Sequence, residues 1–340
     1  MDKHFSWVFN KDCKNINQEL NFIKKNKYNS GFVERYQSNS IPEYNLSKLD
    51  LNNPIIHNDI SNSFKSHGLI VLKNVYSKSI MERYNQWCIE FKEIAKNDPN
   101  CIHPKHKHKF LINDICGRMG ESNPDLLITI LKNKELTTTI DILLGFAKVG
   151  SMTGHWLEPG GDRQLSHVDY PIHLGSSKFW GNNLDKVMKY TTKFQINEML
   201  TNYSLQVLIA SDNMDVSNGS TEVVPFSHQI KNLDFRIHDK NIYNEFEKYF
   251  INTELQQGDI LIFNRRLCHR GGKNISPNRR NSLIIQFVWL WGVGQEIIEY
   301  GKIKDKIEES EFFKMLSLKE QEELVLRLNP PYPNNIKLNT

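Results

Sequence analysis

The feature that most constrains the fold of this chain is a set of polar side chains divided between two distant segments. His167 and Asp169 stand two residues apart, and His269 lies far downstream. Because residues i and i+2 of an extended strand project from one face, the first two side chains can hold one face of an ion together. His269 follows the turn and apolar run 258–263, so we expect it at a strand's end, returned by the fold to the first pair.

Two imidazoles and one carboxylate are the ligands of a mononuclear non-haem Fe(II) site with open positions. Arg280 follows His269 by eleven residues, and the alternation of 280–291 places Arg280 and Ser282 on one face of a strand. A guanidinium matches a carboxylate bidentately, and a serine hydroxyl can add a hydrogen bond. The pattern predicts a catalytic metal site at His167, Asp169 and His269 and a co-substrate carboxylate site at Arg280 and Ser282.

A His-x-Asp pair is a weak signal by itself, since the chain holds 12 histidines and a lone histidine is usually a surface or core residue. The prediction depends on the combination of that pair with a later histidine and an Arg-x-Ser on the next strand.

Three further blocks carry a family resemblance. They are Gly68 to Val75 followed by a helix, Asn218 to His228 (NGSTEVVPFSH), and Gln257 through His269 to Arg280. With the His-x-Asp pair they span roughly residues 60 to 295, and the chain resembles the phytanoyl-CoA dioxygenase family of Fe(II)/2-oxoglutarate-dependent oxygenases. Two positions depart from the family pattern: Val168 stands where glutamine is common, and Phe226 replaces the usual glycine before Ser227 and His228. We interpret His228 as a structural residue of that turn.

The resemblance implies Fe(II), 2-oxoglutarate as co-substrate with its far carboxylate on Arg280, O2, and ascorbate as a supporting reductant. It implies conversion of 2-oxoglutarate to succinate and CO2, coupled to hydroxylation of an unactivated C–H bond in a small-molecule or lipid-derived substrate. The related halogenases carry a small residue in place of the carboxylate ligand, so Asp169 favours hydroxylation. Desaturation and ring closure stay open, and the motifs do not name the substrate.

Two other functions, nucleic-acid demethylase and non-oxygenase cupin, make different demands on the sequence. Nucleic-acid demethylases share an arginine pair six residues apart after the last histidine, whereas position 286 here is glutamine. The net charge of +4 is small for 340 residues and predicts no nucleic-acid partner. A non-oxygenase cupin, binding metal structurally or acting as an isomerase, would need no arginine for a co-substrate.

The pattern of elements predicts an α+β, mainly β chain: a double-stranded β-helix (jelly roll, cupin-like) with flanking helices. Helices are expected at 78–95 behind an N-cap at Ser77, at 124–144 ending at Gly145, at 241–250 and at 302–328. Strands are expected at 148–157, 204–212, 220–224, 259–263 and 281–291, besides the His-x-Asp region.

The expected organisation is a polar N-terminal extension over 1–58, an oxygenase domain over 59–298 with a lid insert near 170–199, and a helical C-terminal extension over 299–340. We expect a monomer or homodimer. The basic run 102–109 is interpreted as a solvated loop. Five scattered cysteines without C-x-x-C, and no signal-like or membrane-spanning apolar stretch, predict a cytoplasmic protein without a membrane span.

Overall fold

The computed structural model describes residues 41–96, 108–169, 204–229, 247, 249–290, 298 and 300–328. The expected lid insert at 170–199 lies outside these residues, as do residues 1–40 of the expected N-terminal extension and most of the helix expected at 241–250.

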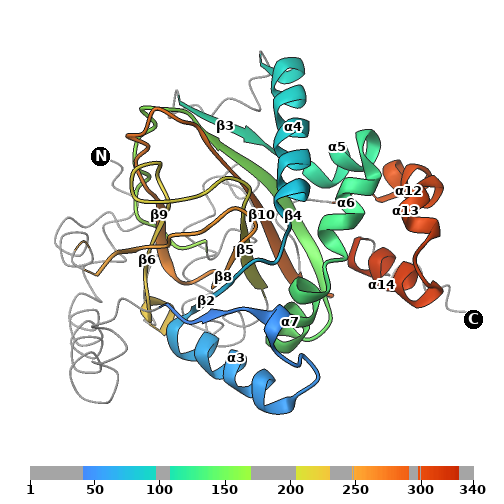
Figure 1. Cartoon of the computed structure of the whole chain (residues 1–340), viewed down its shortest axis with the longest axis horizontal. Helices are drawn as coiled ribbons and strands as arrows, with labels where there is room; N and C mark the ends of the chain where they lie inside the picture. Colours follow the sequence, from blue (N-terminus) through green and yellow to red (C-terminus); the bar gives the residue numbers. More distant parts are fainter. Residues whose placement is uncertain are drawn as a thin grey trace, which may run out of the picture.

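Two β-sheets form the centre of the fold (Figure 1). The large sheet has seven strands in the order β1-β2-β8-β5-β10-β4-β3, and the small sheet has three in the order β7-β6-β9. All neighbours are antiparallel except β1 and β2. The strands are β1 Glu43–Tyr44, β2 Leu69–Leu72, β3 Lys109–Ile112, β4 Ala147–Leu157, β5 Ser204–Ala210, β6 Thr221–Val224, β7 Ile251–Asn252, β8 Ile260–Asn264, β9 Cys268–Gly271 and β10 Arg280–Trp289.

The large sheet is buried on both faces. In β2, Leu69 and Val71 join an apolar cluster with small-sheet residues such as Val223, while Ile70 and Leu72 join the cluster beneath the helices. Successive strand residues point to opposite faces, so a strand covered on both sides must be apolar at nearly every position. The predicted jelly-roll architecture is confirmed, as two facing sheets that do not close into a barrel.

Helices cover the outer face of the large sheet. These helices are the 3-10 helix Leu46–Lys48, α3 Pro54–His67, α4 Lys78–Ala95, α5 Ile115–Ser122, α6 Pro124–Leu131 and α7 Lys134–Leu144. A separate short 3-10 turn, Ser227–Gln229, follows β6. The helix α3 runs across residue 58, where the sequence predicts the oxygenase domain to begin. The predicted N-cap of α4 is confirmed, because the Ser77 side chain accepts a hydrogen bond from the Ile80 N–H.

The single helix expected over 124–144 is wrong, because the chain breaks at Lys132 and Asn133 into α6 and α7. The Asn133 side chain accepts from the Leu136 N–H and donates to the Val75 carbonyl, so it caps a new helix. The predicted end at Gly145 is confirmed, with φ at +71°.

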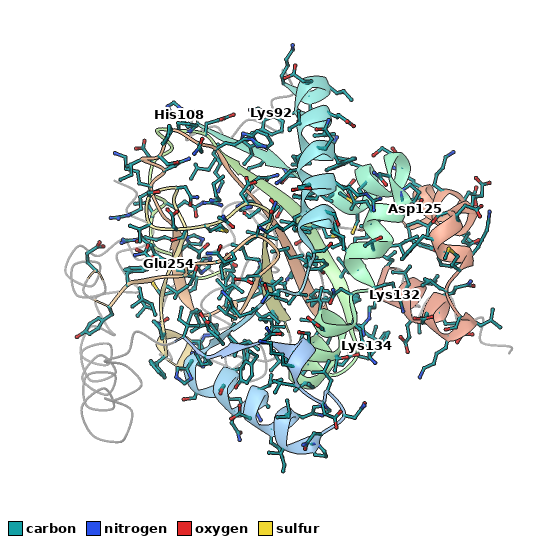
Figure 2. All side chains as sticks on the ribbon, viewed as in Figure 1. Lys92, His108, Asp125, Lys132, Lys134 and Glu254 are labelled. Atoms are coloured by element: carbon teal, nitrogen blue, oxygen red, sulfur yellow. The ribbon has the colours of Figure 1, made fainter. Side chains whose placement is uncertain are left out.

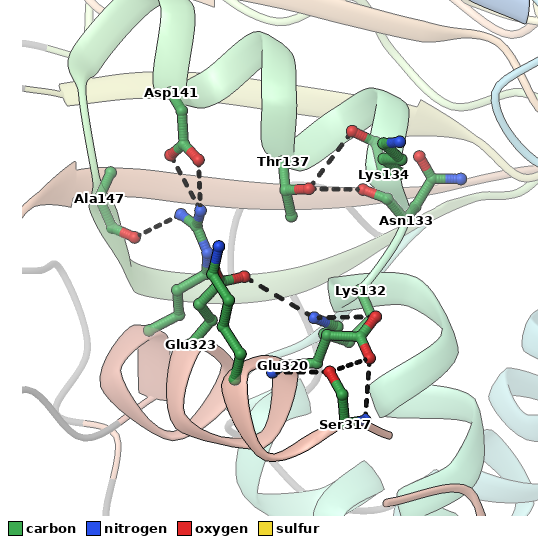
Figure 3. A network of polar contacts seen from close by, with 11 residues as sticks. Lys132, Asn133, Lys134, Thr137, Asp141, Ala147, Ser317, Glu320 and Glu323 are labelled. Atoms are coloured by element: carbon green, nitrogen blue, oxygen red, sulfur yellow. Dashed lines mark hydrogen bonds and ion pairs between the residues drawn. The ribbon is translucent and has the colours of Figure 1, made fainter. Parts of the chain in front are cut away.

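The single helix expected over 302–328 is divided, in the part of the chain that the structure describes after β10, into α12 Tyr300–Glu309, α13 Glu311–Lys314 and α14 Leu318–Leu328. The Ser310 hydroxyl caps α13, and apolar residues of all three helices join the core of the large sheet. Arg327 of α14 donates to both oxygens of Asp141 in α7 and to the Ala147 carbonyl at the start of β4 (Figure 3). Among the described residues, no helix combines the length and apolar character needed to cross a bilayer.

Candidate metal centre

The structure brings the side chains of His167, Asp169 and His269 together between the two sheets. Their nearest donor atoms all lie within 4.8 Å of one another. The Nε2 atoms of His167 and His269 lie 3.9 and 3.8 Å from the same Asp169 oxygen, Oδ1. No other group of three or more His, Cys, Asp or Glu side chains among the described residues shows such spacing.

Backbone pairing holds the two ligand-bearing segments together. His167 and His269 form an antiparallel bridge, with N–H to carbonyl distances of 3.0 and 2.9 Å. The Gln164 N–H donates to the Gly271 carbonyl on one side, and the Asp169 N–H donates to the Arg265 carbonyl on the other. The extended His-x-Asp segment therefore lies along β9 as an additional short partner of the small sheet.

The expected position of His269 at the end of the apolar strand is wrong in detail. The strand β8 ends at Asn264 in the large sheet, and after a turn His269 is the second residue of β9 in the small sheet, paired with Val223. The chain crosses from one sheet to the other between these strands. That crossing places the imidazole opposite the His-x-Asp segment.

Both imidazoles are oriented by backbone carbonyls. The Nδ1 of His167 lies 2.8 Å from the Leu165 carbonyl oxygen, and the Nδ1 of His269 lies 2.9 Å from that of Leu267. A carbonyl only accepts, so each Nδ1 carries the proton and each Nε2 presents its lone pair toward Asp169, the arrangement found in metal-binding histidines. Burial, with the neighbouring His269, lowers the pKa of His167 to about 4, which keeps it neutral near pH 7.

Asp169 is 9% exposed and accepts hydrogen bonds at both its carboxylate and its backbone carbonyl. Its Oδ2 accepts from Gln206 Nε2 at 3.1 Å, and the Arg265 guanidinium donates to its backbone carbonyl. Burial alone would raise the pKa of Asp169, but the electrostatic effects of His269 and Arg265 and the hydrogen bond from Gln206 outweigh burial and hold the pKa below its ordinary value. One carboxylate and two imidazoles fit a divalent cation of the Fe(II) type.

A cavity of about 220 Å³ opens beside these three residues. Its walls come from both sheets, and they include His155, Gln164, Gln206, Phe263, Ile284, Lys109 and Arg280. Besides the metal ligands, the cavity therefore contains two cationic side chains, Lys109 and Arg280. Anionic groups of a bound molecule would meet positive charge here.

Arg280 lies in this cavity wall and is only 5% exposed. Its Nη2 donates to the Gly219 carbonyl at 2.6 Å and its Nη1 to the Ser282 hydroxyl at 3.2 Å. Burial lowers the pKa of Arg280 to about 10, although Asp212 opposes this shift, so the guanidinium stays charged near neutral pH. Arg280 and Ser282 meet on one face of β10, as the alternation of the strand predicts.

The solvated-loop interpretation of the basic run 102–109 is wrong for Lys109. Residues 102–107 lie outside the described part of the chain, and His108 is exposed at the same end of the molecule as Lys92 (Figure 2). Lys109 begins β3, is 9% exposed and lines the cavity. Burial, with the charge of Arg280, lowers the pKa of Lys109 to about 7.

Sequence reasoning also missed His155 and Gln206, which line the cavity from β4 and β5. A usable signal existed at Lys109, because the alternating Lys-Phe-Leu-Ile places the lysine on the face opposite Phe110. Gln206 carries a comparable signal, since a polar residue inside the apolar strand 204–210 needs a partner. The partner itself could not be read from spacing.

Neither of the two departures from the family pattern lines the cavity. Phe226 has φ at +69°, a left-handed conformation in which glycine carries no steric cost, and its ring packs 4.9 Å from that of His67. His228 is 5% exposed, with its Nε2 3.0 Å from the Lys65 carbonyl oxygen, as suits a structural residue. Val168 is buried and its side chain is not among the cavity walls.

Comparison with known proteins identifies a family and a relative of this chain. The family model described as phytanoyl-CoA dioxygenase (PhyH) matches residues 64–282. The dioxygenase lolE1 of Epichloe uncinata is 28% identical over 128 residues, which are 37% of this chain and 40% of that protein, so the chain matches less than half of the length of this relative.

Two solved structures share the fold at low sequence identity. The non-heme alpha ketoglutarate dependent carbocyclase SnoK from nogalamycin biosynthesis aligns with a TM-score of 0.52 at 14% identity, over 78% of this chain and 94% of its own. EctD from S. alaskensis in its apoform gives 0.52 at 14%, over 74% and 81%. Since the family model covers more than half of the sequence, the chain belongs to the phytanoyl-CoA dioxygenase family.

Proposed function

We propose that this protein is an Fe(II)- and 2-oxoglutarate-dependent dioxygenase that hydroxylates an unactivated C–H bond of a small-molecule or lipid-derived substrate. One observation carries the proposal: two imidazole nitrogens and one carboxylate oxygen converge at the wall of a cavity that also holds two buried cations. Such a combination suits a redox metal together with an anionic co-substrate.

His167, Asp169 and His269 would hold the Fe(II) ion, which supplies the activation of O2 when it is bound. The protein orients the three donors in advance, because backbone carbonyls fix both imidazole tautomers and Gln206 fixes the carboxylate. Protein donors would occupy one face of the ion and leave the cavity side for co-substrate and O2.

The two cations would hold 2-oxoglutarate. Arg280 is tied to Gly219 and Ser282, so its planar guanidinium is held in one orientation toward the cavity. A carboxylate gains a bidentate partner there without the entropy cost of ordering a free arginine. Lys109 adds a second positive charge in the same cavity, and a bound anion would restore its protonated form.

Hydroxylation is the outcome we propose, because Asp169 occupies the position that a small residue takes in the related halogenases. The fold alone does not decide the outcome, since SnoK, of similar fold, is described as a carbocyclase. The family is named for phytanoyl-CoA, a lipid-derived molecule, which supports a lipid-derived substrate. The relative lolE1 is described only as a dioxygenase. A cytoplasmic location and a monomeric or homodimeric state are parts of the same proposal.

Two competing functions make different demands on the site. A cupin that binds metal only structurally, or isomerises a sugar, would have no use for Arg280 and Lys109 buried beside the metal ligands. A nucleic-acid demethylase would carry a second arginine where Gln286 stands, fully buried in β10. Turnover of 2-oxoglutarate distinguishes the oxygenase from the structural cupin.

The test is anaerobic titration of the protein with Fe(II) and 2-oxoglutarate, followed by visible absorbance, metal stoichiometry and, after O2 is admitted, succinate formation. We expect one Fe(II) per chain, with iron binding, visible absorbance and succinate formation all lost in Asp169→Ala and His269→Ala. The control is His108→Ala, which alters an exposed histidine outside the ligand set and should behave as wild type. Wild-type iron stoichiometry in both ligand variants would refute the assignment.

The substrate is then sought by incubating the enzyme, Fe(II) and 2-oxoglutarate with a metabolite extract. A compound that gains the mass of one oxygen, in wild type but not in Asp169→Ala, identifies a hydroxylation. A product that loses hydrogen without gaining oxygen would replace hydroxylation by desaturation or ring closure.

A further inference from the structure

We infer that Gln206 is a positioning residue that makes Asp169 a one-oxygen metal ligand. Its amide occupies Oδ2 of the carboxylate, so only Oδ1 is left for the ion. The inference rests on the proposed function and adds a residue that the ligand motif does not contain.

The two oxygens of Asp169 have different surroundings. Both imidazole Nε2 atoms lie closest to Oδ1, at 3.9 and 3.8 Å, whereas Gln206 Nε2 lies 3.1 Å from Oδ2. An ionised carboxylate only accepts hydrogen bonds, so the amide nitrogen of Gln206 must face it and the amide oxygen must point elsewhere. The amide orientation follows from chemistry alone.

Gln206 comes from the interior of the large sheet. It lies on β5, between β8 and β10 in the large sheet, opposite Phe263 and Gln286. Asp169 belongs to the segment paired with the small-sheet strand β9. The hydrogen bond thus joins the two sheets at the ligand, so the ligand's rotation depends on the packing of the sheets.

Fold stability gives little reason for a glutamine at this position. Its Oε1 is buried and has no hydrogen-bond partner among the described residues, and such an orphaned acceptor is unfavourable. A methionine of similar length would fill the space without that cost. The benefit of the amide is therefore its contact with Asp169.

One-oxygen binding matters for the open side of the ion. Three protein donors and a chelating co-substrate leave a single position on an octahedral metal. If Asp169 rotated to bind through both oxygens, its Oδ2 would compete for that position. By holding Oδ2 in a hydrogen bond, Gln206 would keep that metal position available.

The experiment compares wild type, Gln206→Met and Gln164→Met under anaerobic conditions, with Co(II) as a visible spectroscopic probe and Fe(II) for affinity. Gln164 lines the same cavity, but its Oε1 accepts from the Gly271 N–H and does not contact Asp169. For Gln206→Met we expect a changed Co(II) spectrum and Fe(II) binding weakened by roughly 10- to 100-fold. Gln164→Met also removes a cavity hydrogen bond, but it should keep a wild-type Co(II) spectrum and Fe(II) affinity because Gln164 does not contact Asp169.

A wild-type Co(II) spectrum and Fe(II) affinity in Gln206→Met would overturn the inference while leaving the metal site in place. The same result in Gln206→Leu, a second apolar replacement for use if the methionine variant does not fold, has the same meaning. If wild type itself binds neither ion, the proposed function fails, and the two failures are thereby distinguished.

Discussion

Removal of the Arg280 guanidinium is the most direct test of the co-substrate site. The side chain is 5% exposed, and two of its nitrogens are anchored by Gly219 and Ser282. Its Nε is buried without a hydrogen-bond partner among the described residues, so the group still has donors to offer. In Arg280→Ala the distal carboxylate of 2-oxoglutarate would enter the cavity without its bidentate partner.

The expected loss can be sized from the burial of this pair. Truncating one member of a buried, hydrogen-bonded charge pair costs about 2–5 kcal/mol. At about 1.4 kcal/mol for each factor of ten, this corresponds to a rise in Kd of about 30-fold to several thousand-fold. Lys109 keeps one positive charge in the cavity, so we expect the lower half of that range. Ser282→Ala removes the hydroxyl that accepts a hydrogen bond from the charged Arg280 guanidinium and should cost about 1.5 kcal/mol.

The assay is anaerobic titration of the Fe(II)-loaded protein with 2-oxoglutarate, followed by the metal-centred absorbance. Arg279→Ala is the matched control, because Arg279 is the preceding residue and its guanidinium stacks on Trp156 at 4.3 Å, away from the cavity walls. Unchanged affinity in Arg280→Ala together with a large loss in Arg279→Ala would show that the register assigned to β10 is incorrect.

Four further outcomes are expected. Because the pKa of Lys109 lies at about 7, 2-oxoglutarate affinity should fall as pH rises from 6 to 8, and titrations of Lys109→Met should lack this dependence. The pKa of His167 falls from 6.5 in the unfolded chain to about 4, so the unfolded state binds more protons between these values. The metal-free protein should therefore gain stability as pH rises from 4 to 6.5, and a flat profile in urea denaturation would contradict the lowered pKa of this imidazole. Phe226→Gly relieves a left-handed backbone but loses the ring contact with His67, so its unfolding free energy should change by less than about 1 kcal/mol. Arg327→Met removes the bidentate contact with Asp141 and should lower stability by about 1.5–3 kcal/mol in thermal unfolding, with unchanged 2-oxoglutarate affinity.

Local signals predicted most of the elements. Ser77 and Gly145 mark a helix start and a helix end by their own conformational chemistry, and both are confirmed. The strands beginning near 148, 204, 220, 259 and 281 are found within one or two residues of their predicted bounds. The break at Asn133 was missed because an asparagine inside an apolar periodic run is tolerated or caps a new helix according to the contacts around it. Here the hydrogen bond to the Val75 carbonyl and the packing of the core beneath the helices favour Asn133 as a helix cap.

The residues of the site also fall into two groups, those predictable from local sequence and those that depend on contacts between distant segments. His167 with Asp169, and Arg280 with Ser282, were predictable as pairs because each pair shares one face of an extended segment. Lys109 and Gln206 were not, since neither lies near a ligand in sequence. Lys109 reaches the cavity through the pairing of β3 with β4, and Gln206 reaches Asp169 across the two sheets.

By itself the sequence determined the chemistry available to this protein: two imidazoles and a carboxylate, an arginine with a serine on its face, and apolar strands able to bury both sides of a sheet. Only the tertiary structure decided which atoms meet. The crossing from β8 to β9 sets His269 against His167, and the packing of the sheets assigns Asp169 Oδ1 to the centre and Oδ2 to Gln206. The physical reason is range, because strand periodicity acts over a few residues, whereas these contacts depend on the register between strands far apart in the chain.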